Sequence, residues 1–289
     1  MNQLRLPIAA ITDEFSPEPE PALDVMASIG MTGAELLVVF GKNIMDLTDD
    51  EIARVKEMCA ARGIEIISIA SPILKCVLPG GGDVDPRFQQ DTFNSKHTFD
   101  DQARLAERAF AIARMTGAGI IRVFSYWRTV TPEKTFEPVC EALLGLAKQA
   151  ADRGVIIGLE NEHACNVGLA AEAKQVLAAV DHPNLKLVWD PANALVGGED
   201  PFPWGYNLLP VNRIAHVHAK DCHMEGHKPV WGPVGTRSVD WKGQVAALLR
   251  DGYRGYISLE THWPGPGGDK KLGSTICGWN LRGLVAATV

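Results

Sequence analysis

One unit recurs along this chain: a segment with helical periodicity ends near a glycine, and a short apolar run follows within a few residues. A glycine at such a junction is typical of a helix C-cap, where the backbone needs positive φ. The apolar runs are dense in Ile, Val and Leu, as in strands that are buried on both faces of a parallel sheet. The helical segments of these units cover residues 21–30, 49–63, 99–117, 132–154 and 240–252.

Eight apolar runs are predicted to be strands. Helical patterns alternate with them, except that the segment between the sixth and seventh runs is short. This alternation predicts a parallel α/β sheet with right-handed crossovers, and eight repeats predict that it closes into a (β/α)₈ TIM barrel. Such a barrel uses about 250 residues, so we expect a single domain over residues 1–289. The runs cover residues 6–11, 34–40, 64–70, 120–124, 155–160, 185–190, 214–218 and 256–260.

An open, doubly wound sheet is the alternative fold. It is disfavoured because the chain has neither a GxGxxG motif after the first run nor a GxxxxGK(S/T) motif. One connection stands out in either fold: residues 71–97 form a long polar stretch that includes PGGGDVDP. Loops of this length are usually functional or disordered. The stretch is therefore either a mobile surface insertion or a lid, because it leaves the carboxyl end of the third strand.

Composition excludes some classes of partner. The formal net charge is -7 and the pI is near 5.6, which argues against a surface that binds nucleic acid. The chain has no stretch of about 18 uninterrupted apolar residues, so no membrane span is expected. The six cysteines are scattered and form no CxxC pair, which predicts reduced, mostly buried thiols in a cytoplasmic protein.

Candidate metal ligands lie at the carboxyl ends of the last four predicted strands, which finish at Glu160, Asp190, His218 and Glu260. In a barrel these ends converge at one face. Isolated charges after buried strands are costly to desolvate, and a shared cation removes that cost. A single glutamate at such a position is more often an ion-pair partner or a helix cap. Four neighbouring strands that each end in a carboxylate or an imidazole favour a metal site. Three carboxylates and one imidazole suit one divalent ion: Mn²⁺ first, with Mg²⁺, Co²⁺ or Zn²⁺ as alternatives.

Other polar residues surround these four. His216 lies two residues before His218 and so points to the same face; we expect it to sit deeper, as a hydrogen-bonded support of the site. His163 and His262 are expected on exposed loops near the substrate. Trp127 follows the fourth strand, where it either packs on a polyol or covers the barrel rim. Together with the 71–97 loop, the residues expected to contact substrate are Trp127, Arg128, Glu162, His163, Asn193 and Lys220.

Several strand-end motifs resemble those of the xylose isomerase-like superfamily, which contains sugar isomerases, epimerases and inosose dehydratases. The motifs are LENEH, WDPANA, HVHAKD and GYISLETHW, and VDWKGQVAALLRDGYRG resembles the helix before the last strand. The resemblance places the family's metal ligands on Glu160, Asp190, His218 and Glu260. It also implies that Glu160 and Glu260 exchange protons with substrate carbons. Unlike similar ketohexose epimerases, this chain has Asn193 in place of a histidine, and Lys220 and His223 near the place of an arginine.

These observations predict a metal-dependent sugar or sugar-derivative isomerase or epimerase that works through an enediolate. A cation would stabilise the developing charge, and two carboxylates would move the proton. An inosose dehydratase-like lyase shares the first step and is the alternative. An endonuclease IV-like nuclease and a nonenzymatic sugar-binding barrel are less favoured. The expected partner is a small sugar, polyol or sugar phosphate, and a homodimer or homotetramer is expected from the resemblance.

Overall fold

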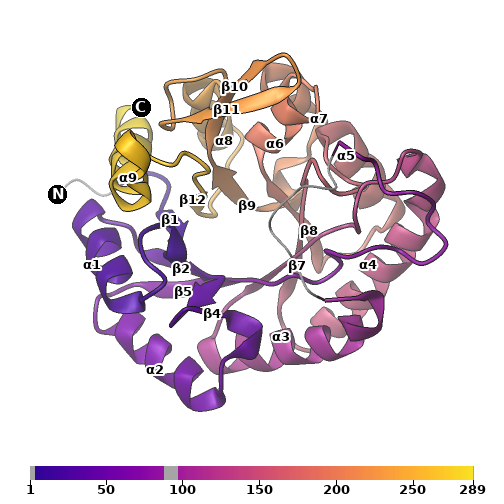
Figure 1. Ribbon diagram of the computed structural model, residues 1–289, viewed down its shortest axis with the longest axis horizontal. Coiled ribbons are helices and arrows are strands. Elements are labelled where there is room, and N and C mark those ends of the chain that lie inside the picture. Colours follow the sequence, from indigo (N-terminus) through magenta and orange to yellow (C-terminus); the bar gives the residue numbers. More distant parts are fainter. Residues whose placement is uncertain (1–3, 88–96, 289) are drawn as a thin grey trace.

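Eight parallel strands form a closed barrel in a computed structural model of the chain, which describes residues 4–87 and 97–288. The order around the barrel is β1-β12-β9-β8-β7-β6-β5-β2, and helices surround it (Figure 1). The predicted (β/α)₈ fold is thereby confirmed. The barrel strands are β1 (Ile8–Ile11), β2 (Gly33–Leu36), β5 (Glu65–Ala70), β6 (Ile120–Val123), β7 (Ile156–Glu160), β8 (Leu185–Trp189), β9 (Ile214–Ala219) and β12 (Ile257–Leu259).

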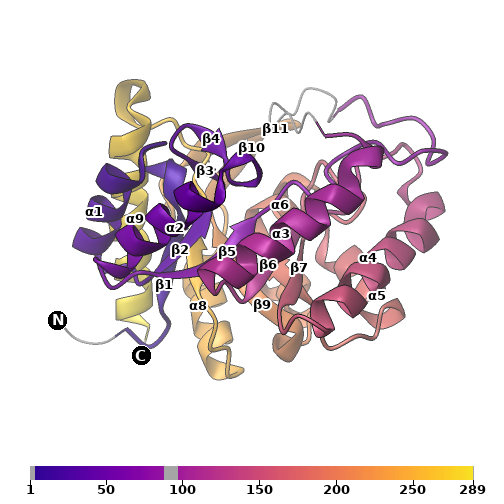
Figure 2. The same cartoon turned by 90° about the horizontal axis from the view of Figure 1, so that it is seen from below.

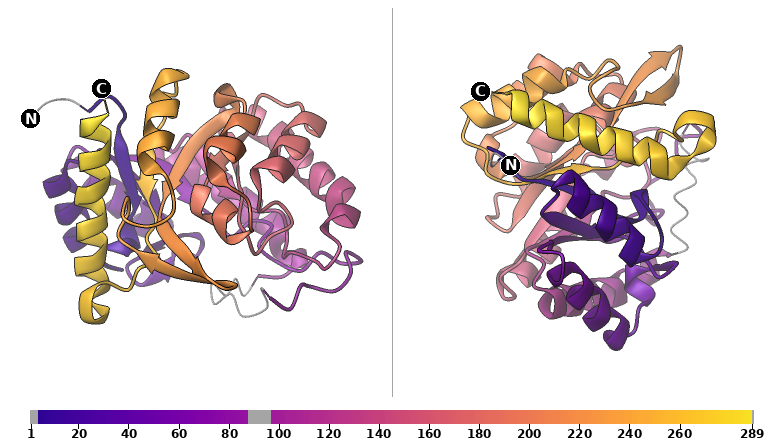
Figure 3. Two further views of the ribbon diagram at one scale, coloured as in Figure 1. Left: turned by 90° about the horizontal axis from the view of Figure 1, so that it is seen from above. Right: turned by 90° about the vertical axis from the view of Figure 1, so that its left-hand side faces the viewer.

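The helices end as the sequence predicts. Gly30 and Gly117 both take φ of 85° at helix C-caps, a conformation that costs glycine little. The final helix lies alongside α1 and completes the ring (Figures 1 and 3). The segment between β8 and β9 holds short helical elements, among them α6 (Pro191–Val196) and α7 (Tyr206–Leu208), as the short predicted connection implies. The longer helices are α1 (Pro19–Ile29), α2 (Asp49–Ala60), α3 (Gln102–Thr116), α4 (Phe136–Ala151), α5 (Ala170–Ala179), α8 (Trp241–Arg250) and α9 (Lys270–Ala287).

The second predicted strand, residues 34–40, is wrong in its extent. β2 ends at Leu36, and β3 (Val38–Val39) turns back to pair antiparallel with β4 (Lys42–Asn43). The carboxylate of Asp13 accepts a hydrogen bond from the Val38 amide at 3.0 Å, which ties this hairpin to the end of β1. A second, unpredicted hairpin, β10 (Asp221–Glu225) and β11 (Lys228–Gly232), follows β9. Both hairpins lie at the same end of the barrel (Figure 2).

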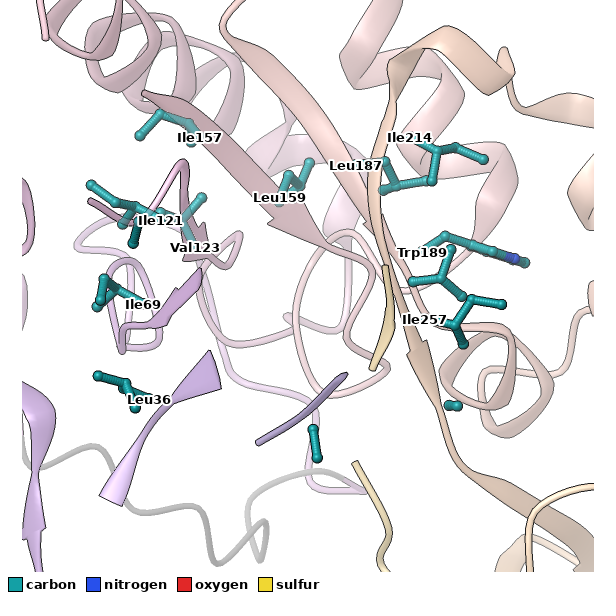
Figure 4. Close-up of a cluster of buried hydrophobic side chains, with 14 of the residues drawn as sticks. Leu36, Ile69, Ile121, Val123, Ile157, Leu159, Leu187, Trp189, Ile214 and Ile257 are labelled. Carbon is teal, nitrogen blue, oxygen red and sulfur yellow. The ribbon is translucent and has the colours of Figure 1, made fainter. Parts of the chain in front are cut away.

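Strand alternation divides the barrel into an apolar outer face and a polar interior. Ile157 and Leu159 on β7 belong to one buried cluster with side chains of α3 and α4, while Glu160 alternates with them. Truncating such a core residue to alanine costs about 2–5 kcal/mol. Figure 4 shows part of this cluster, which includes Leu36, Ile69, Ile121, Val123, Leu187, Trp189, Ile214 and Ile257.

Two expectations from composition also find support among the described residues. All six cysteines are free thiols, and only Cys140 is not fully buried. Within residues 4–87 and 97–288, the helices are too short or too polar to span a membrane.

Candidate metal centre

The four predicted ligands come together at the carboxyl end of the barrel. Glu160 ends β7, Asp190 follows β8, His218 lies near the end of β9 and Glu260 follows β12, and these four strands are neighbours in the barrel. One ligand atom from each lies within 4.8 Å of the others. Nδ1 of His218 is 3.1 Å from Oε1 of Glu160 and 3.3 Å from Oε2 of Glu260. Four side chains from four strands thus converge on one point.

These donors fit a divalent cation. Glu160, Asp190 and His218 are at most 1% exposed. Oε2 of Glu160 and Oδ2 of Asp190 accept no hydrogen bond of ordinary geometry from the described residues, and they face the cationic groups of Arg122 and Lys220. A divalent cation between these carboxylates would satisfy the oxygens by coordination. Local structure orients Asp190: its Oδ1 accepts from the Asn193 amide at 2.9 Å as the N-cap of α6, and its Oδ2 faces the centre.

Two buried cations lie beside the carboxylates. Nζ of Lys220 is 2.9 Å from both Oδ2 of Asp190 and Oε2 of Glu260. Nη1 of Arg122 is 3.3 Å from Oε2 of Glu160. Burial raises the pKa of Asp190 to about 6, against the lowering effect of Lys220. Burial also acts to raise the pKa of Glu260, but Lys220 and His218 hold it well below its usual range.

Sequence reasoning missed Arg122 and Glu35. Arg122 lies inside the predicted strand 120–124, and its alternation with Ile121 and Val123 was the available signal. Glu35 on β2 is fully buried, and its Oε1 accepts hydrogen bonds from Nε2 of His216 at 2.8 Å and of His218 at 3.1 Å. The hydrogen-bonded supporting position predicted for His216 is therefore found, with Glu35 as its partner.

The remaining predicted residues form a polar chain that leads away from the ligands. Nδ2 of Asn193 is 3.4 Å from Oε1 of Glu160, and Oδ1 of Asn193 is 2.9 Å from Nδ1 of His163. The same His163 nitrogen is 2.9 Å from Oε1 of Glu162, and Lys75 lies 3.7 Å from the other Glu162 oxygen. The expectation that His163 and His262 are exposed is wrong, because both are half-buried. His163 contacts Glu162 and Asn193, and the ring of His262 lies 4.5 Å from that of Trp231 between centroids.

A pocket of about 200 Å³ opens beside the ligands. A larger hollow of about 560 Å³ lies at the C-terminal ends of α3 and α4, and its lining includes none of the four ligands. Of these two cavities, the smaller one adjoins the four proposed ligands, because Glu260 is part of its lining. It is lined by Leu37, Val38, Asn43, Pro72, Lys75, Arg122, Phe124, Glu162, Glu260 and His262.

Trp127 and Arg128 differ in their relation to this pocket. Nζ of Lys75 lies 4.5 Å from the Phe124 ring centre and 5.5 Å from that of Trp127, so Trp127 stands behind a pocket residue. Arg128 instead pairs with both carboxylate oxygens of Glu172, at 2.7 and 3.1 Å. The guanidinium is thus held by a carboxylate in the first turn of α5. A contact with substrate stays a prediction for both Trp127 and Arg128.

The described part of the 71–97 loop runs along the loop after β6. The amides of Phe124, Tyr126 and Trp127 donate to the carbonyls of Ile73, Leu74 and Cys76 at 2.7–2.9 Å. Residues 88–96 of the predicted lid lie outside the described residues. The first part of the loop therefore forms one wall of the pocket, through Pro72 and Lys75.

Comparisons with known proteins agree with the barrel fold. The family model described as Xylose isomerase-like TIM barrel matches residues 23–275. An L-ribulose 3-epimerase from Methylomonas sp. (strain DH-1) is 31% identical over 141 residues, 48% of this chain and 46% of that protein, so the match spans about half of the relative. The crystal structure of the IOLI protein with a binding zinc atom has a TM-score of 0.72 at 15% identity, covering 98% of this chain and 99% of that one. D-psicose 3-epimerase with D-tagatose, from Clostridium cellulolyticum H10, has a TM-score of 0.69 at 15% identity over 98% of each chain.

Proposed function

The chain belongs to the xylose isomerase-like TIM barrel family, and from this membership we propose that it is a divalent-metal-dependent isomerase or epimerase of small sugars or sugar derivatives. The observation that carries the proposal is the convergence of Glu160, Asp190, His218 and Glu260 within 4.8 Å beside a pocket. The activities named for the ribulose and psicose 3-epimerases give the substrate class to test first.

Each residue has a stated part in this reaction. Glu160, Asp190, His218 and Glu260 would hold the ion, which supplies stabilisation of the negative charge that develops on a substrate oxygen. Glu260 lines the pocket, so its carboxylate is placed to accept a proton from the carbon next to a ketone. Glu160 is proposed to return the proton to another carbon or face.

Arg122 supports this division of labour. Its Nη1 lies 3.3 Å from Glu160 and 3.8 Å from Glu260, and it lines the pocket. A fixed guanidinium between the two carboxylates adds positive charge where an enediolate would form.

Isotope exchange tests the proposal. Metal-free and Mn²⁺-loaded protein are incubated in D₂O with L-ribulose and with D-tagatose, and NMR follows deuterium incorporation and product formation. We expect about one equivalent of metal per chain, since a single site is implied, and Mn²⁺-dependent exchange next to the carbonyl in at least one ketose. Exchange that is absent with both ketoses, or that does not depend on metal, would overturn the proposal.

A lyase of the inosose dehydratase kind is the second candidate, favoured by one contact. Nζ of Lys220 lies 2.9 Å from Oε2 of Glu260, and an ammonium there could protonate a hydroxyl that leaves as water. Lys220→Met distinguishes the two reactions, because exchange next to the carbonyl would survive while the dehydrated product is lost. If the variant loses exchange with metal intact, Lys220 is itself the base, and assigning the proton transfer to the two glutamates is wrong.

A further inference from the structure

Glu35 has no part in the proposed proton transfer, yet it is fully buried inside the barrel. It comes from β2, while its partners His216 and His218 come from β9, and β1 and β12 lie between these strands in the barrel. The contact therefore crosses the interior. Two imidazole nitrogens, from His216 and His218, lie 2.8 and 3.1 Å from the same oxygen, Oε1 of Glu35, and this arrangement fits a carboxylate oxygen that accepts from both.

The hydrogen bonds to Glu35 define which ring nitrogens carry protons. A carboxylate only accepts, so Nε2 of His216 and Nε2 of His218 both donate to it. In a neutral imidazole the other nitrogen then has a free lone pair. Nδ1 of His216 has no hydrogen-bond partner among the described residues, which agrees with this tautomer. Nδ1 of His218 is the nitrogen that faces Glu160 and Glu260.

We propose that Glu35 is a positioning residue for the metal centre: through Nε2 of His218 it fixes the ring so that Nδ1 is the metal ligand. His216 holds the same carboxylate oxygen from the next layer and keeps it in place. An anionic acceptor on one ring nitrogen makes the other a better ligand, and losing such a partner weakens metal binding about 10–100-fold. This inference rests on the proposed function only for the presence of the metal.

A second metal ion between Glu35, His216 and His218 is the rival interpretation, because their ligand atoms also lie within 4.8 Å of one another. The contacts argue against it. Oε1 of Glu35 lies 2.8 and 3.1 Å from the two imidazole nitrogens, which are direct hydrogen-bond distances. An ion there would have to displace both protons and separate the three atoms.

Metal titration of the full-length protein tests the proposal. Glu35→Gln keeps the shape and one oxygen but removes the charge, and we expect Mn²⁺ to bind about 10–100-fold more weakly by calorimetry. Glu57→Gln, on the exposed side of α2, removes the same charge far from the site and should leave Mn²⁺ affinity unchanged. Circular dichroism establishes that both variants are folded. Equal affinity of Glu35→Gln and the unaltered protein would overturn the proposal.

A second measurement uses the unaltered protein, so it holds even if Glu35→Gln does not fold. With ¹⁵N-labelled histidine and Zn²⁺ as a diamagnetic probe, NMR reports which nitrogen of His218 is protonated and which binds metal. The signal is assigned by its loss in His218→Gln. We expect protonated Nε2 and zinc-bound Nδ1, and the reverse arrangement would overturn the proposal.

The outcomes also separate this inference from the proposed function. If the unaltered protein binds neither Mn²⁺ nor Zn²⁺, both fail together. If it binds metal and Glu35→Gln binds equally well, only the positioning role fails. If Glu35→Gln weakens metal binding but no ketose undergoes exchange, the positioning role stands and the isomerase proposal fails.

Discussion

Two groups of buried carboxylates share His218 and differ in how their charges are satisfied. In the first, Glu35 accepts hydrogen bonds from two imidazoles, which hold its pKa well below its usual range despite burial. In the second, Oε2 of Glu160 and Oδ2 of Asp190 lack a well-formed hydrogen bond and face only the cations Arg122 and Lys220 among the described residues, and burial raises the pKa of Asp190 to about 6 despite Lys220. Burial is similar in both, so the partners make the difference. We call Glu35 with its two imidazole partners the closed group, because its hydrogen bonds are complete and it supports the site. We call Glu160, Asp190 and Glu260 the open group, because these carboxylates are the proposed metal ligands.

The largest expected effect separates the chemistry of the two groups. Glu160→Gln and Glu260→Gln should each reduce exchange of the substrate α-proton with D₂O by about 10²–10⁴-fold, because an amide keeps a ligand oxygen but cannot accept the proton. NMR of the ketose measures the exchange rate. Both changes lie in the open group, and Glu35 in the closed group is expected to act on metal affinity instead.

Metal content has to be measured alongside, because removing a negative ligand weakens the site. The comparison is made at Mn²⁺ concentrations that saturate each variant. If either glutamine variant exchanges at the rate of the unaltered protein while loaded with metal, that glutamate is a ligand alone, and another group carries the proton.

The second effect is a pH dependence that arises from the open group. Burial acts to lower the pKa of His218, but Glu35, Glu160 and Glu260 raise it well above its usual value, so the ring is protonated in the metal-free protein at neutral pH. A metal needs the bare nitrogen and must displace that proton. Mn²⁺ affinity should therefore fall as pH falls, by about tenfold per pH unit for each proton displaced, and more steeply below about pH 6, where Asp190 also protonates.

Calorimetry in two buffers with different heats of ionisation measures the number of protons released on binding. Release of about one proton near pH 7 is expected. No release and an affinity that is constant from pH 5.5 to 8 would show that His218 is already deprotonated, and that the open group is less acid-sensitive than its contacts indicate.

The smallest effect concerns the pocket rim, outside both groups. Trp127 stands behind Lys75, and Trp127→Ala should raise the Michaelis constant by about two- to tenfold, since aromatic contacts contribute about 0.5–1.5 kcal/mol. Turnover and Mn²⁺ affinity should stay unchanged. Steady-state kinetics on the best ketose measures this, and an unaltered Michaelis constant would assign Trp127 to covering the rim.

Sequence alone was sufficient to predict the barrel and the convergence of four polar side chains at its carboxyl end, for the same reason. Buried parallel strands read as dense apolar runs, and a charge directly after such a run is conspicuous, as at Glu160 and Asp190. The closed barrel and the convergence of the four side chains follow from that pattern. The glycine C-caps were equally predictable, because they depend only on the positive φ that the local backbone needs at the end of a helix.

The site roles of polar residues inside the strands could not be predicted in this way. Glu35 and Arg122 lie within apolar runs. Alternation along the strand indicates the face of Arg122, but the partners that either residue meets across the barrel depend on strand register, which the sequence does not state. The β2 boundary failed for a related reason, since the bond from Val38 to Asp13 joins segments 25 residues apart. The hairpin β10–β11 was missed because polar segments such as residues 221–225 carry no apolar signature.

The contact of Glu35 with β9 also constrains the order in which the chain can be assembled. Its bonds to His216 and His218 span 181 and 183 residues, so they are among the most non-local in the molecule. Contacts of this kind form late and slow the search for the native state. Until β9 joins the barrel, the carboxylate of Glu35 has no imidazole from which to accept a hydrogen bond, and the ring of His218 is not held in position. In a partly assembled barrel the proposed ligands are still far apart, so we expect tight metal binding at the proposed site to be acquired only at the end of folding.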